Sequence, residues 1–326
     1  MQKIIGIGNS LVDILTKVEE DAILDNMELP KGSMQLIDGN RLTAIQRHMN
    51  TLEHSNASGG SASNTIKSLA QLGADTAFIG KVANDETGKF FCSEMNKAGV
   101  NMSIMRQKES NISSGTAYTF VSKDGQRTFA TYLGISAELS AEDITDDIFD
   151  RYQILYVEGY LIVNHTLMER IMSLAKNKGL TVCLDLASYN IVEAERDFFN
   201  TILKQYVDIV FANEEEATAF TGKKPEEATL DLAELTSIAV VKMGKDGACA
   251  CENGKIEKVK AQPCKQIIDT TGAGDYFAAG FLYAYINGWS QKRRLETGSI
   301  TAAAVIQVMG ATLPPDQWTQ IKTIIG

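Results

Sequence analysis

The decisive stretch of this 326-residue sequence reads Asp269-Thr270-Thr271-Gly272-Ala273-Gly274-Asp275, and a strongly helical segment, Tyr276–Ile286, follows it at once. Gly272 and Gly274 let the backbone turn tightly and approach a ligand, because glycine carries no side chain. The free N–H groups and the dipole of the following helix favour a bound anion. The stretch therefore predicts an anion-binding turn at the start of a helix.

Asp275 falls in the first turn of that predicted helix. A carboxylate in this place can accept the proton of an attacking hydroxyl, as transfer of a phosphoryl group requires. The neighbouring amides can stabilise the charge of the phosphoryl group during its transfer. The alternative is a glycine-rich turn in which Asp275 only helps to start the helix, and the length of the pattern favours the catalytic interpretation.

Apolar runs of strand length alternate with segments of helical period along the whole chain. The expected strands are Ile4–Gly8, Thr76–Val82, Ile154–Val157, Leu180–Asp185, Ile209–Ala212 and Ile238–Met243, and the expected helices are Ser61–Leu72, Thr166–Asn177, Ala273–Ile286 and Gln291–Met309. Such alternation predicts an α/β fold with a mostly parallel sheet covered on both faces. No linker or repeat divides the chain, so we expect a single domain over residues 1–326.

Two segments, about 16–37 and 114–133, interrupt this alternation. Ser114–Val121 and Arg127–Leu133 alternate in polarity around Lys123-Asp124-Gly125-Gln126, which is a hairpin signal. We expect the two segments to form a small β lid over an active site; an ordinary edge hairpin is the alternative. Because uncovered strand edges tend to pair, a homodimer formed through the lid is a further expectation.

Composition and charge argue against several classes of function. The formal net charge is −10 with both signs interspersed, whereas a nucleic-acid binder needs a basic surface. No apolar stretch approaches the ~20 residues of a membrane-spanning helix. The five cysteines form no CxxC pair and the three histidines have no zinc-site spacing. We expect a cytoplasmic protein that binds a small molecule and neither nucleic acid nor membranes.

Two motifs resemble those of a known family. The stretch Asp269–Asp275 is similar to the C-terminal signature of the PfkB, or ribokinase-like, carbohydrate kinases. The stretch Gly59-Gly60-Ser61-Ala62-Ser63-Asn64, continued as far as Gly88, resembles their N-terminal signature, and the likeness extends from Gly6 to Gly310. It implies a ribokinase-like fold, which has a mostly parallel central sheet, helices on both faces and a small β lid.

The resemblance implies a phosphotransferase with an alcohol group as acceptor. ATP, with Mg²⁺, would give its γ-phosphoryl group to a hydroxyl of a sugar. We expect this hydroxyl to be a primary one. The alternative is a ribonucleoside kinase of the adenosine type, because Gly8–Asp13, Gly59–Lys67 and Gly115-Thr116 with Arg127–Gly134 look like the adenosine-kinase branch. The choice between sugar and nucleoside stays open. A catalytically silent nucleotide or sugar sensor is a more remote alternative, which the intact motifs oppose.

The resemblance also implies roles for residues at matching positions. Asp275 would be the general base, and the amides of Gly272, Ala273 and Gly274 would form the anion hole. The implied substrate-binding residues are Asp13, Asn9, Gly59, Gly60 and Asn64. The implied ATP-binding residues are Asn213, Lys242, Gly244, Gly247, Thr271, Gly272 and Gly274.

Two metal ions are implied in the same way. Asn213 and Glu216, one turn apart on a helix, would organise Mg²⁺ through water, which suits a hard cation that keeps several waters. Glu158, at the end of another strand, is a further candidate for that water shell. Asp269 matches a position that helps to hold a monovalent cation in many members, together with carbonyls near Val305 to Gly310. Whether this chain needs K⁺ stays open.

Overall fold

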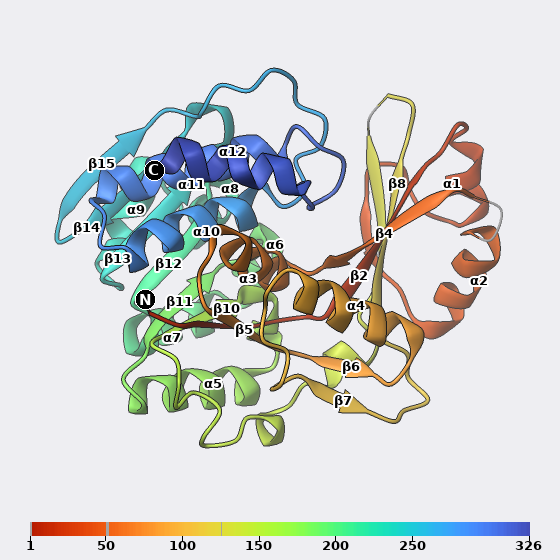
Figure 1. The fold of residues 1–326 in the computed structure, drawn as a ribbon, viewed down its shortest axis with the longest axis horizontal. Helices are drawn as coiled ribbons and strands as arrows, with labels where there is room; N and C mark the ends of the chain where they lie inside the picture. Colours follow the sequence, from red (N-terminus) through yellow and green to blue (C-terminus); the bar gives the residue numbers. More distant parts are fainter. Residues whose placement is uncertain (1, 50–51, 125) are drawn as a thin grey trace.

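The structure is a computed structural model that describes residues 2–49, 52–124 and 126–326. Its centre is an eight-stranded sheet with the strand order β15-β14-β13-β12-β11-β10-β1-β5 (Figure 1). The strands from β5 to β13 in this order are parallel, and β14 and β15 join antiparallel at one edge. Their bounds are β1 Ile4–Ile7, β5 Thr76–Ile79, β10 Ile154–Glu158, β11 Thr181–Asp185, β12 Ile209–Asn213, β13 Ile238–Lys242, β14 Ala248–Glu252 and β15 Lys255–Val259.

Helices cover both faces of this sheet because successive side chains of a strand point to opposite sides. Ile4 packs into the apolar core on one face, and its neighbour Ile5 packs into the core on the other. The first core lies under α3 (Ser61–Leu72), α4 (Glu86–Lys97), α10 (Ala273–Ile286) and α11 (Gln291–Val305). The second lies under α5 (His165–Asn177), α6 (Tyr189–Ala194), α7 (Arg196–Tyr206), α8 (Glu214–Thr221) and α9 (Pro225–Ala233). A last helix, α12 (Pro315–Ile325), packs through Trp318 against Tyr276.

A second, five-stranded sheet stands beside the central sheet, at the right of Figure 1. We call it the small sheet, and its order is β3 (Met34–Leu36), β9 (Arg127–Tyr132), β8 (Gly115–Val121), β2 (Leu11–Lys17) and β4 (His54–Gly59). Its outer face packs against α1 (Ala22–Asn26) and α2 (Gly39–Met49) through an apolar cluster of its own. A further two-stranded sheet joins β6 (Lys81–Ala83) to β7 (Arg106–Lys108).

The predicted α/β fold is confirmed, and the differences are local. The expected strand Thr76–Val82 is two strands interrupted at Gly80, where an added Cβ would lie 2.1 Å from the Ser10 hydroxyl oxygen. The expected helix Gln291–Met309 ends at Val305, because the next carbonyl, that of Ile306, accepts hydrogen bonds from a neighbouring loop. The hairpin β14–β15 and the strand β4 were not predicted.

The predicted lid segments, 16–37 and 114–133, both fall in the small sheet or its connections. The sheet also contains β4, whose polar sequence gave no strand signal, and nearly all of β2, whose sequence LVDILTK is mostly apolar but was not predicted as a lid strand. Gly125, in the predicted hairpin turn, lies outside the described residues. The division of the chain into one domain with an inserted lid stays a prediction. In the described part of the chain, no helix combines the length and apolar character needed to cross a bilayer.

Candidate active site

Polar side chains end four neighbouring strands of the central sheet. Glu158 ends β10, Asp185 ends β11, Asn213 ends β12 and Lys242 ends β13. The strands are parallel and in register, with Glu158 opposite Asp185 and Asn213 opposite Lys242. The carboxyl ends of parallel strands are where open α/β sheets bind ligands. The candidate site is therefore at this edge of the sheet, where α3 and α10 also begin.

Asp275 is the third residue of α10, after the left-handed turn at Gly272, whose φ is +76°. The hydroxyl of Ser61 donates to one carboxylate oxygen of Asp275 at 2.7 Å, and the amide nitrogen of Asn64 donates to the other at 3.0 Å. The Thr65 hydroxyl donates to the backbone carbonyl of Asp275 at 3.2 Å. The first turn of α3 thus fixes the orientation of the predicted base.

The environment of Asp275 also makes it a better proton acceptor. Burial raises the pKa of Asp275 from 3.8 to about 6, against the lowering effect of the Ser61 and Asn64 hydrogen bonds. The charge of Asp185 raises this pKa further, and that of Lys242 lowers it. A base with a pKa of about 6 is ionised at neutral pH and remains more basic than an exposed aspartate.

The predicted substrate residues Asp13, Gly59 and Gly60 lie together. Asp13 is on β2 and Gly59 on the paired strand β4, where an added Cβ would lie 2.1 Å from an Asp13 carboxylate oxygen. Gly60 has a φ of +93°, and a Cβ there would lie 2.4 Å from the backbone oxygen of Asn9. Both positions therefore need glycine, and the absence of side chains brings the backbone against the Asp13 carboxylate.

Lys67 is a buried cation that the sequence did not single out, since the helical period places it away from the apolar face of α3. Its ammonium group donates to the backbone and side-chain oxygens of Ser58 and to the Thr312 hydroxyl, at 3.0–3.2 Å. Burial lowers the pKa of Lys67 to about 8. Burial also raises the pKa of Asp13 to about 7, and the nearby charge of Lys67 opposes that rise.

Asn9, predicted to bind substrate, has its side chain engaged within the protein. Its amide nitrogen donates to Glu158 at 2.6 Å, and its amide oxygen accepts from the Ser136 hydroxyl at 3.3 Å. Glu158 also accepts from the backbone N–H of Ala62 at 3.1 Å, and burial raises its pKa to about 7. In this structure Asn9 and Glu158 therefore join the end of β1 to the start of α3.

Lys242 lies next to the predicted anion hole. Its ammonium group donates to Asp185 at 2.8 Å and lies 3.1 Å from the point where a Cβ on Gly274 would be. Although burial opposes the charged form, the carboxylates of Asp185 and Glu216 raise the pKa of Lys242. A positive charge is therefore kept beside the amides of Gly272–Gly274. Asp185 was missed, although its place at the end of an apolar strand was a signal.

Asn213 and Glu216 form a reciprocal capping box at the start of α8. The Asn213 side chain accepts from the Glu216 N–H at 2.8 Å, and the Glu216 carboxylate accepts from the Asn213 N–H at 2.8 Å. Burial and then the charge of Asp185 raise the pKa of Glu216 to about 7. Among the described residues no three His, Cys, Asp or Glu side chains gather to hold a metal directly. The role of this pair in holding Mg²⁺ through water stays a prediction.

A largely apolar groove runs from Gly274 along α10 and α11. The predicted ATP-binding residues Lys242, Gly244 and Gly247 line it. The walls that the sequence did not identify include Ala261, Pro263, Phe277, Ala302, Ala303 and Ile306. Phe277, Ala302 and Ala303 have the sequence pattern of an ordinary buried helix face, and Ala261 and Pro263 lie in a loop, so only the fold reveals them. The groove suits a flat apolar ring whose polar end points to the anion-binding turn.

A smaller cavity separates the small sheet from the anion-binding turn. It is bounded by the small sheet on one side, with Asp13, Leu15 and Thr119, and by Thr271 and Met309 on the other. Next to it, the small-sheet residue Arg127 forms an ion pair with Asp269 and donates to the Thr271 hydroxyl at 2.5 Å. The predicted residues Asp269 and Thr271 therefore contact the small sheet.

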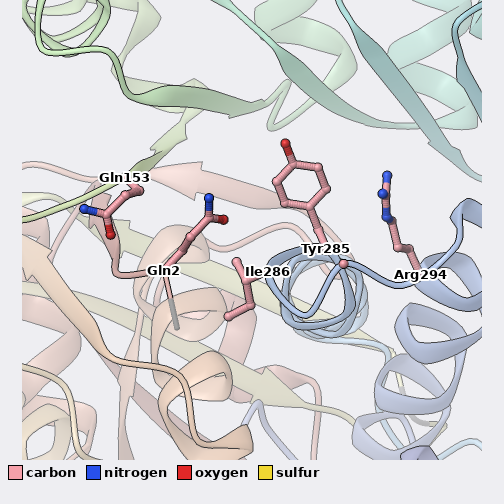
Figure 2. A pocket seen from close by; sticks show the side chains of 6 residues that line it. Gln2, Gln153, Tyr285, Ile286 and Arg294 are labelled. Carbon is pink, nitrogen blue, oxygen red and sulfur yellow. The ribbon is translucent and has the colours of Figure 1, made fainter.

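Figure 2 shows a different pocket, at the opposite end of the central sheet. Gln2 and Gln153 precede β1 and β10, so this pocket lies at the amino ends of the strands. Its cation, Arg294, pairs with Glu252 at 3.1 Å and lies over the Tyr285 ring at 4.9 Å. None of the predicted site residues lines it, so it is separate from the candidate active site.

Comparisons with known proteins agree with this geometry. The model of the pfkB family carbohydrate kinases matches residues 33–318. A 5-dehydro-2-deoxygluconokinase from Clostridium perfringens is 28% identical over 265 residues, covering 76% of this chain and 78% of that protein. A probable sugar kinase from Rhizobium etli has a TM-score of 0.88 and 32% identity, covering 99% of this chain and 98% of that one. Adenosine kinase from Sinorhizobium meliloti has a TM-score of 0.89 and 30% identity, covering 99% of each chain. The chain belongs to the pfkB family of carbohydrate kinases and is an ATP-using phosphotransferase that acts on a sugar or nucleoside hydroxyl.

Proposed function

We propose that this protein transfers the γ-phosphoryl group of ATP to a primary hydroxyl of a sugar, with Asp275 as the general base. The arrangement of Asp275 carries the proposal. Its carboxylate is held by Ser61 and Asn64 in the first turn of α10, beside the backbone amides of Gly272 and Gly274. The Ala273 N–H between them donates to the Thr270 carbonyl at 3.2 Å. A base and an anion hole are thus adjacent, as phosphoryl transfer requires.

In the proposed step, the substrate hydroxyl oxygen forms a bond to the γ-phosphorus while the bond from that phosphorus to the bridging oxygen of ADP breaks. ADP leaves with the electron pair of the broken bond, and Asp275 takes the hydroxyl proton. The amides of Gly272, Ala273 and Gly274 stabilise the charge on the transferring group. Lys242, beside Gly274, adds a fixed positive charge to the same place.

The nucleotide would lie in the groove along α10 and α11, with its base among the apolar walls and its phosphates at Gly244, Gly247 and Gly274. Thr271, predicted to bind ATP, lines the adjacent cavity toward the small sheet. Asn213 and Glu216 would hold Mg²⁺ through water, and the ion would neutralise phosphate charge. The capping box supports this role, because it fixes the Glu216 carboxylate before any ion arrives.

The sugar would bind between Asp13, Asn64 and the backbone of Gly59 and Gly60. A carboxylate can accept hydrogen bonds from two vicinal hydroxyls, which gives directional selection. Asp13 fits this role because its half-buried carboxylate lies against Gly59 and borders the cavity.

A ribonucleoside is a second candidate substrate, favoured by apolar side chains at the mouth of the site. Phe129 of the small sheet lines an open pocket with Ile267 and Ile268, which are 61% and 46% exposed. Met34 is paired in register with Phe129 and is 56% exposed. Such a wall suits a nucleobase better than a free sugar, whose faces carry hydroxyls.

The small sheet, together with segments 16–37 and 114–133 that form part of it and of its connections, would serve as a lid. Its closure would exclude water, so that ATP is not hydrolysed in place of transfer.

The edge strand β3 of the small sheet exposes Met34 and Leu36, which supports a homodimer through the lid. A sedimentation profile of monomer alone would remove the dimer. We also propose a cytoplasmic location, which fits the five free cysteines.

The test is ADP formation from MgATP with a panel of free sugars and ribonucleosides, using purified parent protein and the variant Asp275→Asn. We expect turnover with one member of the panel and its loss in the variant. The class of the best substrate decides between sugar and nucleoside. Turnover by the variant at the parental rate would refute Asp275 as base, and nucleotide binding without turnover on any compound would favour the sensor.

A further inference from the structure

The ion pair between Arg127 and Asp269 lies where the family resemblance predicts a monovalent cation. Arg127 comes from the first residue of β9 in the small sheet, and Asp269 belongs to the loop before α10. Their side chains are 14% and 0% exposed. A fully buried carboxylate requires a compensating charge, and in this structure the guanidinium supplies it.

Protein donors occupy most of the acceptor positions of the Asp269 carboxylate. One of its oxygens accepts the Thr271 N–H at 2.6 Å and also contacts the guanidinium of Arg127. The other oxygen accepts the Gly310 N–H at 2.7 Å. Each carboxylate oxygen is therefore already bound by a protein donor, and the negative charge already has its counterion.

Two of the backbone carbonyls expected to complete a cation site are also in use. The Ile306 oxygen accepts from Ile268 at 2.8 Å and from Asp269 at 3.2 Å, and a carbonyl oxygen has only two lone pairs. The Val305 oxygen accepts from Val308 at 3.1 Å. The two bonds to the Ile306 oxygen tie the 268–271 loop directly to the 305–310 loop. The two loops are thus held together without an ion between them.

We propose that Arg127 takes the place of a monovalent cation, so that phosphoryl transfer by this protein does not depend on K⁺. Arginine remains protonated at any pH at which proteins are folded, and its planar donors suit a carboxylate. Through Asp269 and Thr271 it would hold the backbone that leads into the Gly272–Gly274 amides. Arg127 is in this sense a positioning residue of the anion hole.

The proposal gives the small sheet a role beyond enclosing substrate. Because the guanidinium comes from β9, the charge on Asp269 is compensated only when the small sheet lies against the 269–275 turn. A free ion would be present in either position of the lid. The anion hole would therefore be ordered by lid closure itself.

The first experiment measures kinase activity in KCl, NaCl and choline chloride at equal ionic strength, and its kinetic readout rests on the proposed function. We expect the parent protein to change by less than about twofold between salts, and Arg127→Gln to fall at least about tenfold in choline chloride. We expect KCl to restore part of the variant's activity, and Arg127→Lys to keep more activity than Arg127→Gln. The matched control is Lys123→Gln, a cation of the same hairpin that pairs with the exposed Glu19 and should behave as the parent does.

A second experiment needs no turnover, so it separates failure of this inference from failure of the proposed function. An ion that binds only the folded state raises the melting temperature. We expect KCl, compared with choline chloride, to stabilise Arg127→Gln but not the parent. The inference is overturned if KCl activates the parent about tenfold or more. It is also overturned if Arg127→Gln keeps parental activity in choline chloride, or if KCl stabilises parent and variant equally.

Discussion

The central sheet and the small sheet bury their strands differently, and the candidate site lies between them. Strands β1 and β10 of the central sheet are buried on both faces. The small sheet packs its outer face against α1 and α2 and turns Asp13, Leu15 and Thr119 of its other face to the cavity, while its central strand β8 is buried along its whole length. Side chains of the small sheet that line a cavity can select a ligand, whereas the central sheet provides fixed strand ends that carry charged groups.

The two regions would also contact different substrates of the proposed reaction. Residues from the central sheet, such as Lys242 and Asp185, lie beside the anion-binding turn and would serve the nucleotide. Residues of the small sheet, such as Asp13, would serve the hydroxyl substrate. Asp275 stands between them, bonded to α3 at the junction. Substitutions in the two regions should therefore separate the kinetic constants for the two substrates.

The largest effect is expected at the junction. Asp275→Asn should lower kcat by about 100-fold or more, because the amide cannot take the hydroxyl proton. The KM values for ATP and for the sugar should change little, since the side chain keeps its size. Initial rates and a thermal melt would check this. A rise in KM with kcat unchanged would show that Asp275 binds substrate and does not act as the base.

The next effect should be confined to the small sheet. In Gly59→Ala the new methyl group would meet the Asp13 carboxylate at 2.1 Å, so Asp13 must move. We expect the KM of the hydroxyl substrate to rise about tenfold or more, as overpacking of about 1–3 kcal/mol implies. The KM of ATP should stay near its parental value. An equal rise in the two KM values would contradict the assignment of the hydroxyl substrate to the small sheet and of ATP to the central sheet.

The matched change on the nucleotide side is Gly247→Ala. Gly247 has a φ of +97°, and a Cβ there would lie 2.0 Å from the Val259 oxygen. We expect a rise of similar size, about tenfold, in the KM of ATP, with the KM of the sugar unchanged. Calorimetric titration of the variant with ATP would show directly that its affinity for ATP is lower. Unchanged ATP affinity would remove the 244–247 turn from the nucleotide site.

A smaller effect should appear in the pH profile. Because burial raises the pKa of Asp275 to about 6, its active, ionised form is lost as the pH falls through that value. The rate constant kcat/KM should therefore decline on the acid side by about tenfold per pH unit below 6. An acid limb near pH 4, where an exposed aspartate titrates, would contradict the buried environment described for Asp275.

The smallest effect is expected at the rim. Phe129→Ala removes part of the apolar wall formed with Ile267 and Ile268. If the substrate is a nucleoside, its KM should rise about fivefold, because some apolar contact is lost. For a free sugar we expect no measurable change. Comparing the change in KM for a nucleoside with the change in KM for a free sugar would show which substrate contacts Phe129.

Much of the site could be predicted because its parts are local. The turn Asp269–Asp275, the capping pair Asn213 and Glu216 and the helix Ser61–Leu72 are all written within short windows of sequence. Lys67 was not identified, because the pattern of a single helix assigns its side chain to the polar face. Asp185 was not identified, because its importance comes from its ion pair with Lys242, which ends β13 on the far side of β12.

The sequence by itself determined the alternation of strands and helices, the glycine turn before α10 and the family, since periodicity and backbone freedom are properties of neighbouring residues. Only the tertiary structure decided the partners. It brought Ser61 to Asp275 and Arg127 to Asp269 across long separations in the chain. Burial then changed the chemistry of the groups that met, raising the pKa of Asp275 and leaving the Asp269 charge to be balanced by an arginine. Desolvation and pairing depend on what surrounds a residue in space, and no window of sequence contains that information.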